Sequence, residues 1–266
     1  MCIEKRGTLG GTCLNVGCIP SKALLNSTHK LHEAQHTFKE MGIETGEVSM
    51  NFPQLMKTKD KAVGGLTSGI EFLFKKNGVD YVKGWGKFGG PNTIDVDGND
   101  GKKHSISAKH TIIATGSEPN SLPKGVLDID EEYVITSTGA LALKEVPKKM
   151  TVIGGGVIGL EMGSVYARLG TEVTVVQGSD RLCPSMDAEV TIQFQKILKK
   201  QGIKFMMSSK LKSGVNNREK GVSLIIDTPK GEQALDSDVV LLSIGRKPFT
   251  EGLQLEKAGL TSNGRG

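Results

Sequence analysis

The pattern that most constrains this sequence is the segment 148–177, KKMTVIGGGVIGLEMGSVYARLGTEVTVVQ. The apolar run Met150–Ile153 predicts a strand, the glycines after it fit G-x-G-x-x-G, and a helix with small residues leads to a second strand. In such a unit Gly154 permits the tight turn, Gly156 lets a pyrophosphate approach the backbone, and Gly159 allows close packing of the helix on the strand. The helix N-terminus also offers unpaired N–H groups to phosphates. We expect a dinucleotide site here, the alternative being a purely structural turn.

The second strand of this unit ends at Gln177, where dinucleotide-binding folds usually carry an acid that holds the ribose 2′-hydroxyl of NAD. Glutamine can still hydrogen-bond the diol, but it repels a 2′-phosphate less than a carboxylate does. No arginine occupies position 177, although Arg181 lies four residues further on. We therefore expect NAD to be preferred to NADP.

Size and composition exclude several classes of function. The 266 residues suffice for two domains, and the 35 glycines with few aromatic residues suit an α/β fold with many tight turns. The formal charge of +5 is not concentrated in a basic segment with aromatic residues, so we expect no nucleic acid partner. No apolar run approaches the roughly 20 residues that span a bilayer, and MCIEKRG lacks the apolar region of a signal peptide.

The rest of the chain predicts alternating helices and strands. A long helix is expected from Cys13 to about Glu40 and a second over Phe52–Lys76, with Asn77-Gly78 as its stop signal. Residues 79–116 predict an antiparallel meander that leads into the strand HTIIATG. After the glycine unit we expect a helix from about Asp187 to Gln201, another meander and the strand DVVLLSIG.

Two short segments repeat one pattern. IIATGSEP (Ile112–Pro119) and LLSIGRKP (Leu241–Pro248) each consist of an apolar strand, a glycine, two polar residues and a proline, and each follows a meander. The simplest interpretation is two related Rossmann-like nucleotide-binding domains in tandem, the first incomplete at its start. Chance similarity of two strand ends is the alternative.

A second motif, GGTCLNVGCIPSKALL at Gly10–Leu25, contains two cysteines, Cys13 and Cys18. Zinc is not expected because no second Cys/His pair accompanies them, and so small a loop would be a poor structural staple. In a regular helix residues five apart differ by about 7.5 Å along the axis, and a disulfide needs Cα atoms within roughly 4.4–6.8 Å.

A bridge between these cysteines therefore requires a distorted first turn, and distorted disulfides reduce readily. The backbone flexibility that this distortion needs is provided by Gly10, Gly11 and Gly17. In addition, the N-terminus of a helix lowers the pKa of a nearby thiol. We interpret Cys13 and Cys18 as a redox-active disulfide.

The same segment resembles the redox segment of the flavin-dependent pyridine nucleotide–disulfide oxidoreductases. Its residues are most similar to those of the dihydrolipoamide dehydrogenase branch. HTIIATGSEP, GGGVIGLE and SIGRKPFT extend the resemblance through nearly the whole chain. Glutathione reductases tend to carry a doubled lysine after the proline. Mercuric reductases usually carry valines where this chain has Leu14 and Ile19, and both kinds of reductase remain alternatives.

The resemblance implies roles for individual residues. Cys13 exchanges with dihydrolipoamide, Cys18 faces the flavin, and Lys22 lies near the flavin N5 as a stabilising cation. Glu4, at the end of the strand in CIEKRG, holds the adenosine ribose of FAD. Without the resemblance, we would interpret Glu4 as an ordinary surface glutamate. Further FAD positions are Gly11, Thr12, Gly86, Thr115, Gly116 and Ser117. The NAD positions are Gly154, Gly155, Gly156, Val157, Ile158, Gly159, Glu161, Gln177, Leu211 and Gly245.

The implied reaction passes two electrons from dihydrolipoamide to the disulfide and through FAD to NAD. The implied fold is α/β, with tandem three-layer Rossmann-like FAD- and NAD(P)-binding domains and antiparallel meander insertions. Residues 1–117 form a partial FAD-binding domain with the redox helix, 118–247 the NAD-binding domain, and 248–266 the return to the first domain. Implied partners are dihydrolipoamide on a lipoyl-domain protein of 2-oxoacid dehydrogenase or glycine cleavage complexes, and a second copy in a homodimer. The implied location is the mitochondrial matrix for a eukaryotic source and the cytoplasm for a bacterial one.

The sequence departs from the family pattern at both ends. The first FAD glycine motif is expected ahead of Met1, and the strand ending in Gly-Asp and the dimerisation domain with its catalytic His–Glu pair are expected beyond Gly266. We therefore expect a fragment that binds FAD poorly and turns over little, or a non-catalytic NAD-binding chain. His29, His32 and His36 share a helix face that we interpret as solvated, so no metal site is expected.

Overall fold

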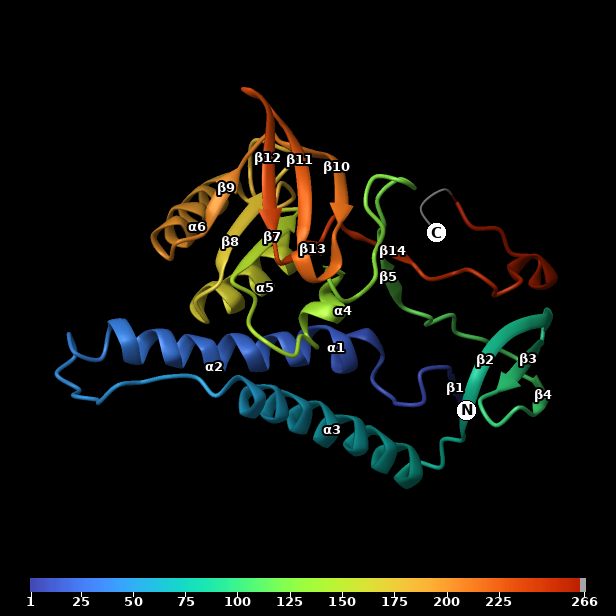
Figure 1. Cartoon of the computed structure of the whole chain (residues 1–266). Coiled ribbons are helices and arrows are strands. Elements are labelled where there is room, and N and C mark those ends of the chain that lie inside the picture. The colour runs from blue at the N-terminus through green and yellow to red at the C-terminus, as the bar shows by residue number, and fades with distance from the viewer. Residues whose placement is uncertain (264–266) are drawn as a thin grey trace. The chain divides into compact units, whose positions relative to one another are not determined.

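The computed structural model describes residues 1–263 and is shown in Figure 1. Its internal contacts divide the chain into two units. Unit 1 combines Met1–Cys18 and Lys61–Glu118 with the described residues from Arg246 onward, and unit 2 combines Ile19–Asp60 and Pro119–Gly245.

Unit 2 contains a parallel five-stranded sheet of order β6-β13-β7-β8-β9. Its strands are β6 (Val134–Ile135), β13 (Val239–Leu242), β7 (Lys149–Ile153), β8 (Glu172–Val176) and β9 (Lys204–Met206). Parallel neighbours need a crossover, which α5 (Val157–Arg168) provides from β7 to β8 and α6 (Ala188–Lys200) from β8 to β9. The predicted succession of strand, glycine turn, helix and strand over 148–177 is confirmed.

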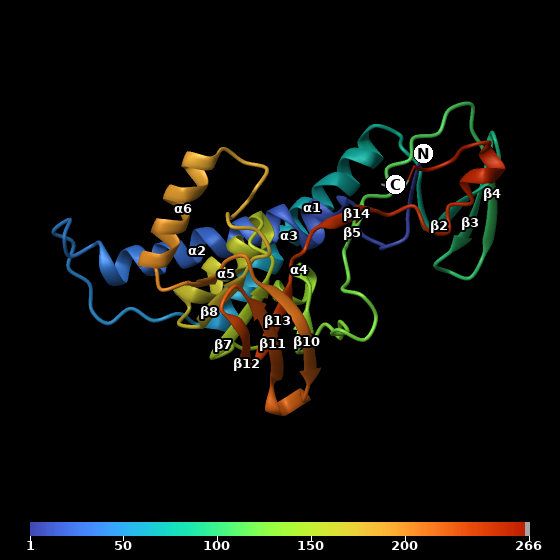
Figure 2. The same ribbon diagram turned by 90° about the horizontal axis from the view of Figure 1, so that it is seen from above.

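The two faces of this sheet are covered differently, because successive side chains of a strand point to opposite sides. Along β7, Met150 and Val152 belong to one buried cluster and Ile153 to another. Strand β13 alternates in the same way, with Leu241 in the first cluster and Val240 in the second. Figure 2 shows the resulting three layers, with α5 on one side of β7 and β8 and the strands β10–β12 on the other.

The helical layer comprises α5, α4 (Ser137–Ala140) and the unit 2 parts of α2 (Cys18–His36) and α3 (Phe52–Lys76). Leu24, Phe52 and Leu55 enter the same buried cluster as the sheet. The buried Tyr166 hydroxyl donates a hydrogen bond to the Ala140 carbonyl at 2.5 Å, and burial raises the pKa of this hydroxyl. The predicted helix over Phe52–Lys76 is confirmed.

A buried lysine joins α3 to the end of α4. The Lys59 ammonium donates to the Leu141 carbonyl at 2.6 Å and lies 2.9 Å from a carboxylate oxygen of Asp60. Its side chain is only 8% exposed, so this charge depends on both partners. A cation at the carbonyl end of a helix is also favoured by the helix dipole.

The opposite face of the parallel sheet is covered by an antiparallel meander of β10 (Lys210–Asn216), β11 (Val222–Thr228) and β12 (Gly231–Ser237), with the 3-10 turn η1 (Arg218–Lys220). Val222, Leu224 and Ile226 alternate along β11, and all three are buried. The predicted second meander is confirmed. The helix predicted over 187–201 is also confirmed as α6, whose first-turn N–H groups are capped by the Asp187 carboxylate.

Unit 1 is built around a sheet of order β1-β2-β3-β4. Its strands are β1 (Cys2–Glu4), β2 (Tyr81–Gly90), β3 (Thr93–Gly98) and β4 (Lys103–Ser107). β1 runs parallel to β2, and the other pairs are antiparallel, which confirms the first predicted meander. Phe88, Ile94 and Val96 form its core, and Leu255 of the 3-10 turn η2 (Leu255–Ala258) packs against them.

The single helix predicted from Cys13 to about Glu40 is wrong. It consists of two helices, α1 (Gly11–Val16) and α2, and α2 ends at His36. The break lies at Gly17, whose backbone (φ -142°, ψ -116°) is not helical. Beyond His36 the chain turns at Gly42 (φ 78°), and the neighbouring Met41 and Ile43 are exposed, so no packing favours a longer helix.

The strand predicted over HTIIATG (110–116) is also wrong, since this segment has no strand pairing within residues 1–263. Ile112 is 89% exposed and Ile113 is exposed as well. An isolated extended segment gains neither ladder hydrogen bonds nor apolar burial, so its β propensity alone does not make it a strand.

The repeated pattern corresponds to two strands that pair with each other, β5 (Ser117–Pro119) and β14 (Arg246–Pro248). They follow Gly116 (φ 76°) and Gly245 (φ 111°), which share a left-handed conformation that favours glycine. The Gly116 carbonyl accepts a hydrogen bond from the Phe249 N–H, and the Gly245 carbonyl accepts one from the Asn120 N–H, each at 3.0 Å. The two copies are therefore equivalent from the glycine onward, whereas their apolar parts differ, because only the second copy contains a paired strand, β13.

The contact units and the expected domains differ in one respect. The unit changes at 118/119 and 245/246 lie within two residues of the expected boundaries at 117/118 and 247/248. Residues 19–60, expected in the first domain, group with unit 2 because they contribute to its core. The functional domains 1–117, 118–247 and 248–266 stay a prediction, and 264–266 lie outside the described residues. Within the described part of the chain, no helix is both long and apolar enough to cross a membrane.

Leu241 tests the packing of unit 2, because its side chain is 0% exposed between the layers. Leu241→Ala is expected to lower the free energy of unfolding by about 2–5 kcal/mol, through lost apolar burial and a residual cavity. Urea unfolding followed by circular dichroism measures this change. The control is Ile197→Ala on α6, which is 53% exposed and is expected to change stability by less than about 1 kcal/mol. Equal losses for both variants would contradict the packing described.

Candidate dinucleotide site and cysteine pair

The turn between β7 and α5 is closed by backbone contacts that leave no room for two side chains. A Cβ atom on Gly159 would lie 2.4 Å from both the Gly154 carbonyl oxygen and the Ser243 Oγ. Gly154 has φ 107°, and a Cβ atom there would lie 2.5 Å from the Ser243 carbonyl oxygen. Such distances are too short for real Cβ atoms, so α5 can begin at this place only with glycine at both positions.

Gly156, between them, has open space beside it. A Cβ atom on Gly156 would meet no atom within 4 Å. This residue is the N-cap of α5, with an extended backbone (φ -82°, ψ 177°) and no side-chain cap. An uncapped helix N-terminus beside open space suits an anionic pyrophosphate, so the residues present fit a dinucleotide.

Ser243 supports the turn from β13, a role that the glycine motif does not predict. Its hydroxyl donates to the carbonyl oxygens of Gly154 at 2.8 Å and Ile153 at 3.1 Å. These bonds hold the carbonyl ends of β13 and β7 together where the glycine turn begins. The available signal was its place in the repeated pattern, directly after a buried strand.

Gln177 supports the turn from the end of β8. Its Oε1 accepts a hydrogen bond from the Gly155 N–H at 2.8 Å, while its Nε2 donates to the Ser179 Oγ at 2.6 Å and the Arg181 carbonyl at 3.2 Å. A ribose hydroxyl can therefore use only the second lone pair of Oε1, because both amide hydrogens are engaged. The sequence assigned Gln177 a ligand role, which stays a prediction, and did not reveal its bond to the turn.

Cys183 lies against the same turn. It is 4% exposed, its N–H donates to the Gly155 carbonyl at 3.0 Å, and its Sγ lies 3.7 Å from the same oxygen. Burial raises the pKa of the Cys183 thiol, so this sulfur stays protonated and is a poor nucleophile. Leu211, expected near NAD, is partly buried against the second cluster, and its ligand role stays a prediction.

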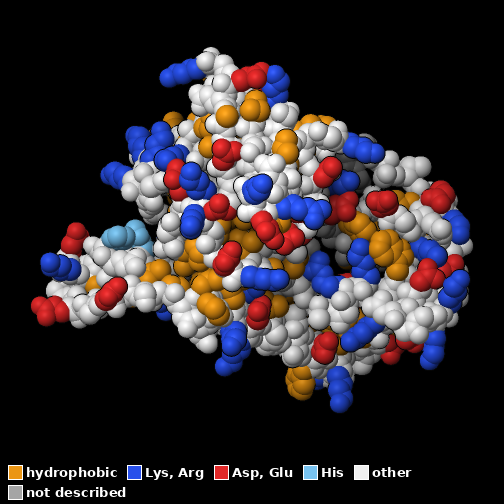
Figure 3. Space-filling view, viewed as in Figure 1, with side chains coloured by type: hydrophobic (Ala, Val, Ile, Leu, Met, Phe, Trp, Pro, Cys, Tyr) orange, Lys and Arg blue, Asp and Glu red, His pale blue; other side chains and the backbone are white. Residues whose placement is uncertain are grey.

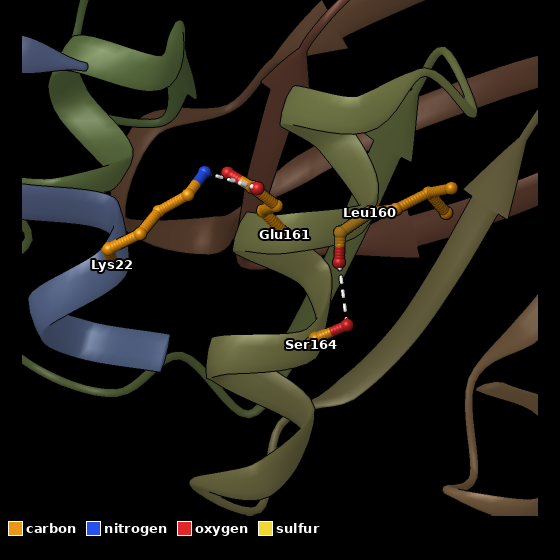
Figure 4. A network of polar contacts seen from close by, with 4 residues as sticks. All are labelled: Lys22, Leu160, Glu161 and Ser164. Carbon is orange, nitrogen blue, oxygen red and sulfur yellow. Dashed lines mark hydrogen bonds and ion pairs between the residues drawn. The ribbon is translucent and has the colours of Figure 1, made fainter. Parts of the chain in front are cut away.

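Two residues assigned to different cofactors form an ion pair in unit 2. The Lys22 ammonium of α2 lies 2.5 Å from the Glu161 Oε1 of α5, as Figure 4 shows. The Ser164 hydroxyl, one turn further along α5, donates instead to the Leu160 carbonyl at 2.7 Å. The Lys22 side chain is 60% exposed, so solvent screens the attraction and the pair orients the ammonium more than it stabilises the fold.

Cys13 and Cys18 lie on the two sides of the break at Gly17, the first within α1 and the second as the first residue of α2. Both are exposed and in the thiol form. A Cβ atom on Gly17 would lie 2.8 Å from the Thr12 carbonyl oxygen and 3.2 Å from the Cys13 Cα. The chain can fold back on Cys13 only because position 17 has no side chain. The distorted turn that a bridge requires is present, and the redox role stays a prediction.

Several residues expected to hold FAD converge in unit 1. The Glu4 carboxylate accepts a hydrogen bond from the Arg6 N–H at 2.8 Å, and the Arg6 guanidinium donates to the Gly11 carbonyl at 3.3 Å. The Thr12 Oγ1 lies 3.7 Å from the position of a Cβ atom on Gly116. Glu4 keeps lone pairs that can accept hydrogen bonds from ribose hydroxyls, so this carboxylate fits the adenosine ribose of FAD.

The other FAD candidates make structural contacts, and their cofactor roles stay predictions. The Thr115 hydroxyl donates to a backbone carbonyl after β14 at 2.5 Å, and the Ser117 hydroxyl accepts from the Arg246 Nε at 2.8 Å. A Cβ atom on Gly86 would lie 3.3 Å from the Ile3 Cγ2, so Gly86 allows β1 and β2 to pack closely.

The histidines of α2 have local partners. The His32 and His36 rings meet edge to face, with centroids 4.5 Å apart, and the His29 Nε2 lies 3.5 Å from Glu33. The pKa of His32 is lowered, mainly because the ring is partly buried and to a smaller extent because His36 and Arg168 lie nearby. Over residues 1–263, no group of three or more His, Cys, Asp or Glu residues could hold a metal ion.

The full sequence, residues 1–266, matches the family model described as pyridine nucleotide-disulphide oxidoreductase, and the chain belongs to this family. FAD and NAD are the cofactors of the class.

Curated relatives carry more specific names. Dihydrolipoamide dehydrogenase of Chaetomium thermophilum is 55% identical over 100% of this chain, and dihydrolipoyl dehydrogenase 1, mitochondrial, of Arabidopsis thaliana is 54% identical over 100%. Leghemoglobin reductase of Vigna unguiculata is 56% identical over 98%. The chain covers 53%, 52% and 50% of these proteins respectively, so it spans about half the length of the curated relatives it matches.

Solved structures show the same fold. The HOCl-induced flavoprotein disulfide reductase RclA of Escherichia coli superposes with a TM-score of 0.79 at 25% identity, over 99% of this chain and 55% of that one. The Cu(II) complex of that reductase gives a TM-score of 0.80 at 24% identity, with the same coverage.

The two glycine environments give opposite expectations for alanine substitution. Gly159→Ala should destabilise unit 2, because its Cβ would clash with the Gly154 carbonyl. Gly156→Ala should leave the urea midpoint unchanged but weaken NADH binding more than about tenfold, because its Cβ enters the space beside the helix N-terminus. Urea unfolding and calorimetric titration with NADH measure the two effects. Undiminished NADH affinity in Gly156→Ala would place the pyrophosphate elsewhere.

Proposed function

We propose that this chain carries the cysteine pair and the NAD site of a flavin-dependent disulfide oxidoreductase that oxidises dihydrolipoamide with NAD. The observation that carries the proposal is the glycine-dependent break between Cys13 and Cys18, because it supplies the backbone distortion that a reversible bridge between close cysteines needs. The dinucleotide turn in the same chain and the dihydrolipoamide dehydrogenases among its relatives support the same reaction.

The thiol chemistry follows from the two cysteines. A thiolate of dihydrolipoamide attacks the Sγ of Cys13 in the disulfide form, and Cys18 leaves as a thiolate. The second thiolate of the substrate then attacks the substrate sulfur of the mixed disulfide, which releases lipoamide and the Cys13 thiolate. Two electrons thus pass to the protein for each substrate disulfide formed, and the two substrate protons go to solvent or to a base.

FAD, when bound, supplies the two-electron carrier between thiols and NAD. The chain's own residues have binding and orienting roles in this proposal. Glu4 holds ribose hydroxyls of FAD, and the N-terminus of α5 with Gly156 receives the pyrophosphate of NAD. The ion pair with Glu161 fixes the direction of the Lys22 ammonium.

The partners and the cellular location are part of the proposal. A dithiol substrate of this kind would be presented on a lipoyl-domain protein of a 2-oxoacid dehydrogenase or glycine cleavage complex. Relatives from Arabidopsis thaliana, Pisum sativum and Schizosaccharomyces pombe are named mitochondrial, which supports the mitochondrial matrix for a eukaryotic source. Assembly as a homodimer is proposed for the full-length protein.

Thiol titration tests the cysteine pair. We expect mild oxidation of the folded chain to remove two of the four thiols, counted after unfolding because Cys183 is buried, and dithiothreitol to restore them. Cys13→Ser and Cys18→Ser should each abolish this loss, whereas Cys2→Ser, the control in β1, should retain it. Four thiols that persist under oxidising conditions in the folded chain would refute the proposal.

Gly17→Ala tests the backbone break. Its Cβ would lie 2.8 Å from the Thr12 carbonyl oxygen, so the local backbone must move and the two sulfurs should join more slowly. We expect the rate of intramolecular oxidation to fall by more than about tenfold, because disulfides form only within a narrow Cα separation. Quenched-flow alkylation measures the rate. Gly46→Ala, in open space, is the control, and equal rates in both variants would contradict the role of the break.

Flavin binding separates the oxidoreductase from a related NAD-binding protein. Titration with FAD should give a yellow complex whose partial reduction produces a long-wavelength thiolate–flavin band that the Cys18→Ser variant lacks. A chain that binds NADH but no FAD under any conditions would support the non-catalytic alternative.

A further inference from the structure

Position 177 distinguishes this dinucleotide site from one built around an acid. In such sites a carboxylate offers two oxygen acceptors to the ribose diol and repels a 2′-phosphate. Gln177 is neutral, and its amide is already committed to the turn through Gly155, Ser179 and the Arg181 carbonyl. It therefore offers one remaining lone pair to a hydroxyl and no charge that would repel a phosphate.

A lysine lies beside the same strand end. The residue after Gln177 is Gly178, and a Cβ atom there would lie 3.8 Å from the Lys210 Cγ and 3.9 Å from the Lys210 Cε. The aliphatic stem of Lys210 therefore crosses Gly178, and its ammonium is one bond beyond the last of these atoms. Among residues 1–263, no hydrogen bond or ion pair engages this ammonium.

The other charged residues near this strand end carry both signs. Asp180 and Arg181 follow in the same loop, with the Arg181 guanidinium bonded to the Pro184 carbonyl at 2.7 Å. Lys212, two residues along β10 from Lys210, is paired with Glu232 on the neighbouring strand. Lys210 faces Asp227 across the β10–β11 pair, but no ion pair joins these two side chains among the described residues, so the Lys210 ammonium stays available to a ligand.

We propose that the adenosine end of this site accepts a 2′-phosphate beside Gln177 and Lys210, so that the chain binds NADPH as well as NADH. The proposal rests on the proposed function because it concerns the same nucleotide site, and it names the ligand class more fully. Because Gln177 stands where such sites usually carry an acid, the hydrogen bonding to the ribose of NADH is weaker and no carboxylate repels the 2′-phosphate of NADPH. The Lys210 ammonium attracts this phosphate. The two affinities should therefore lie within about tenfold of each other, a weaker preference for NAD than position 177 alone led us to expect.

Calorimetric titration of the 266-residue chain with NADH and with NADPH tests the proposal without requiring flavin or turnover. Gln177→Glu keeps an acceptor for the Gly155 N–H and adds a negative charge, so NADPH affinity should fall at least about tenfold relative to NADH. Lys210→Gln should lower NADPH affinity by about three- to tenfold and leave NADH affinity unchanged. Lys212→Gln is the matched control, since its ammonium is paired, and it should not change the ratio.

The outcomes separate this inference from the proposed function. A wild-type chain that binds NADH but binds NADPH more than about a hundredfold more weakly would overturn the inference and leave the NAD site intact. Equal effects of Lys210→Gln and Lys212→Gln would overturn the role of Lys210, even if Gln177→Glu failed to fold. A folded wild-type chain that binds neither nucleotide would overturn both the inference and the proposed function.

Discussion

The close approach of Gly159 to the backbone around Gly154 is the contact on which unit 2 depends. It lets α5 begin directly on the sheet, and it places an uncapped helix N-terminus at the carbonyl ends of β7 and β13. Ser243 and Gln177 secure the turn from the strands on either side. The buried alternation along β7 and β13 then follows, because the helix and the meander cover opposite faces of the same strands.

Local signals in the sequence were sufficient to predict a helix or strand where tertiary packing favoured the same element. The helix over Phe52–Lys76, the Asp187 cap of α6 and both meanders follow from periodicity and turn residues. The strand expected over 110–116 was predicted from its apolar residues after a meander and from the repeated pattern, and it failed because no described strand pairs with it. The expected helix over 13–40 failed at Gly17, where the backbone conformation depends on the fold of the chain around Cys13.

In the candidate sites too, some features could be predicted from local sequence, whereas others depend on contacts between distant residues. The glycine positions and the cysteine pair are visible as spacing, since each requires a particular residue type at a particular place. The bonds of Ser243 and Gln177 to the turn, and the pairing of Lys22 with Glu161, join residues that are 22 to 139 positions apart. Such partners depend on the course of the chain, which one sequence does not specify at side-chain resolution. Figure 3 shows Lys, Arg, Asp and Glu side chains scattered over the face in view, so composition alone does not tell which of them pair.

Lys59 differs from most lysines of this basic chain in its chemical accessibility. Its ammonium is held between the Leu141 carbonyl and Asp60 with little exposure to water, so an acylating reagent in solution cannot reach its nitrogen while the surrounding core is intact. Exposed lysines such as Lys22 and Lys204 will be labelled in the native protein. Labelling at position 59 will instead report the opening of the α3–α4 contact, which makes this amine an internal marker for local unfolding of unit 2.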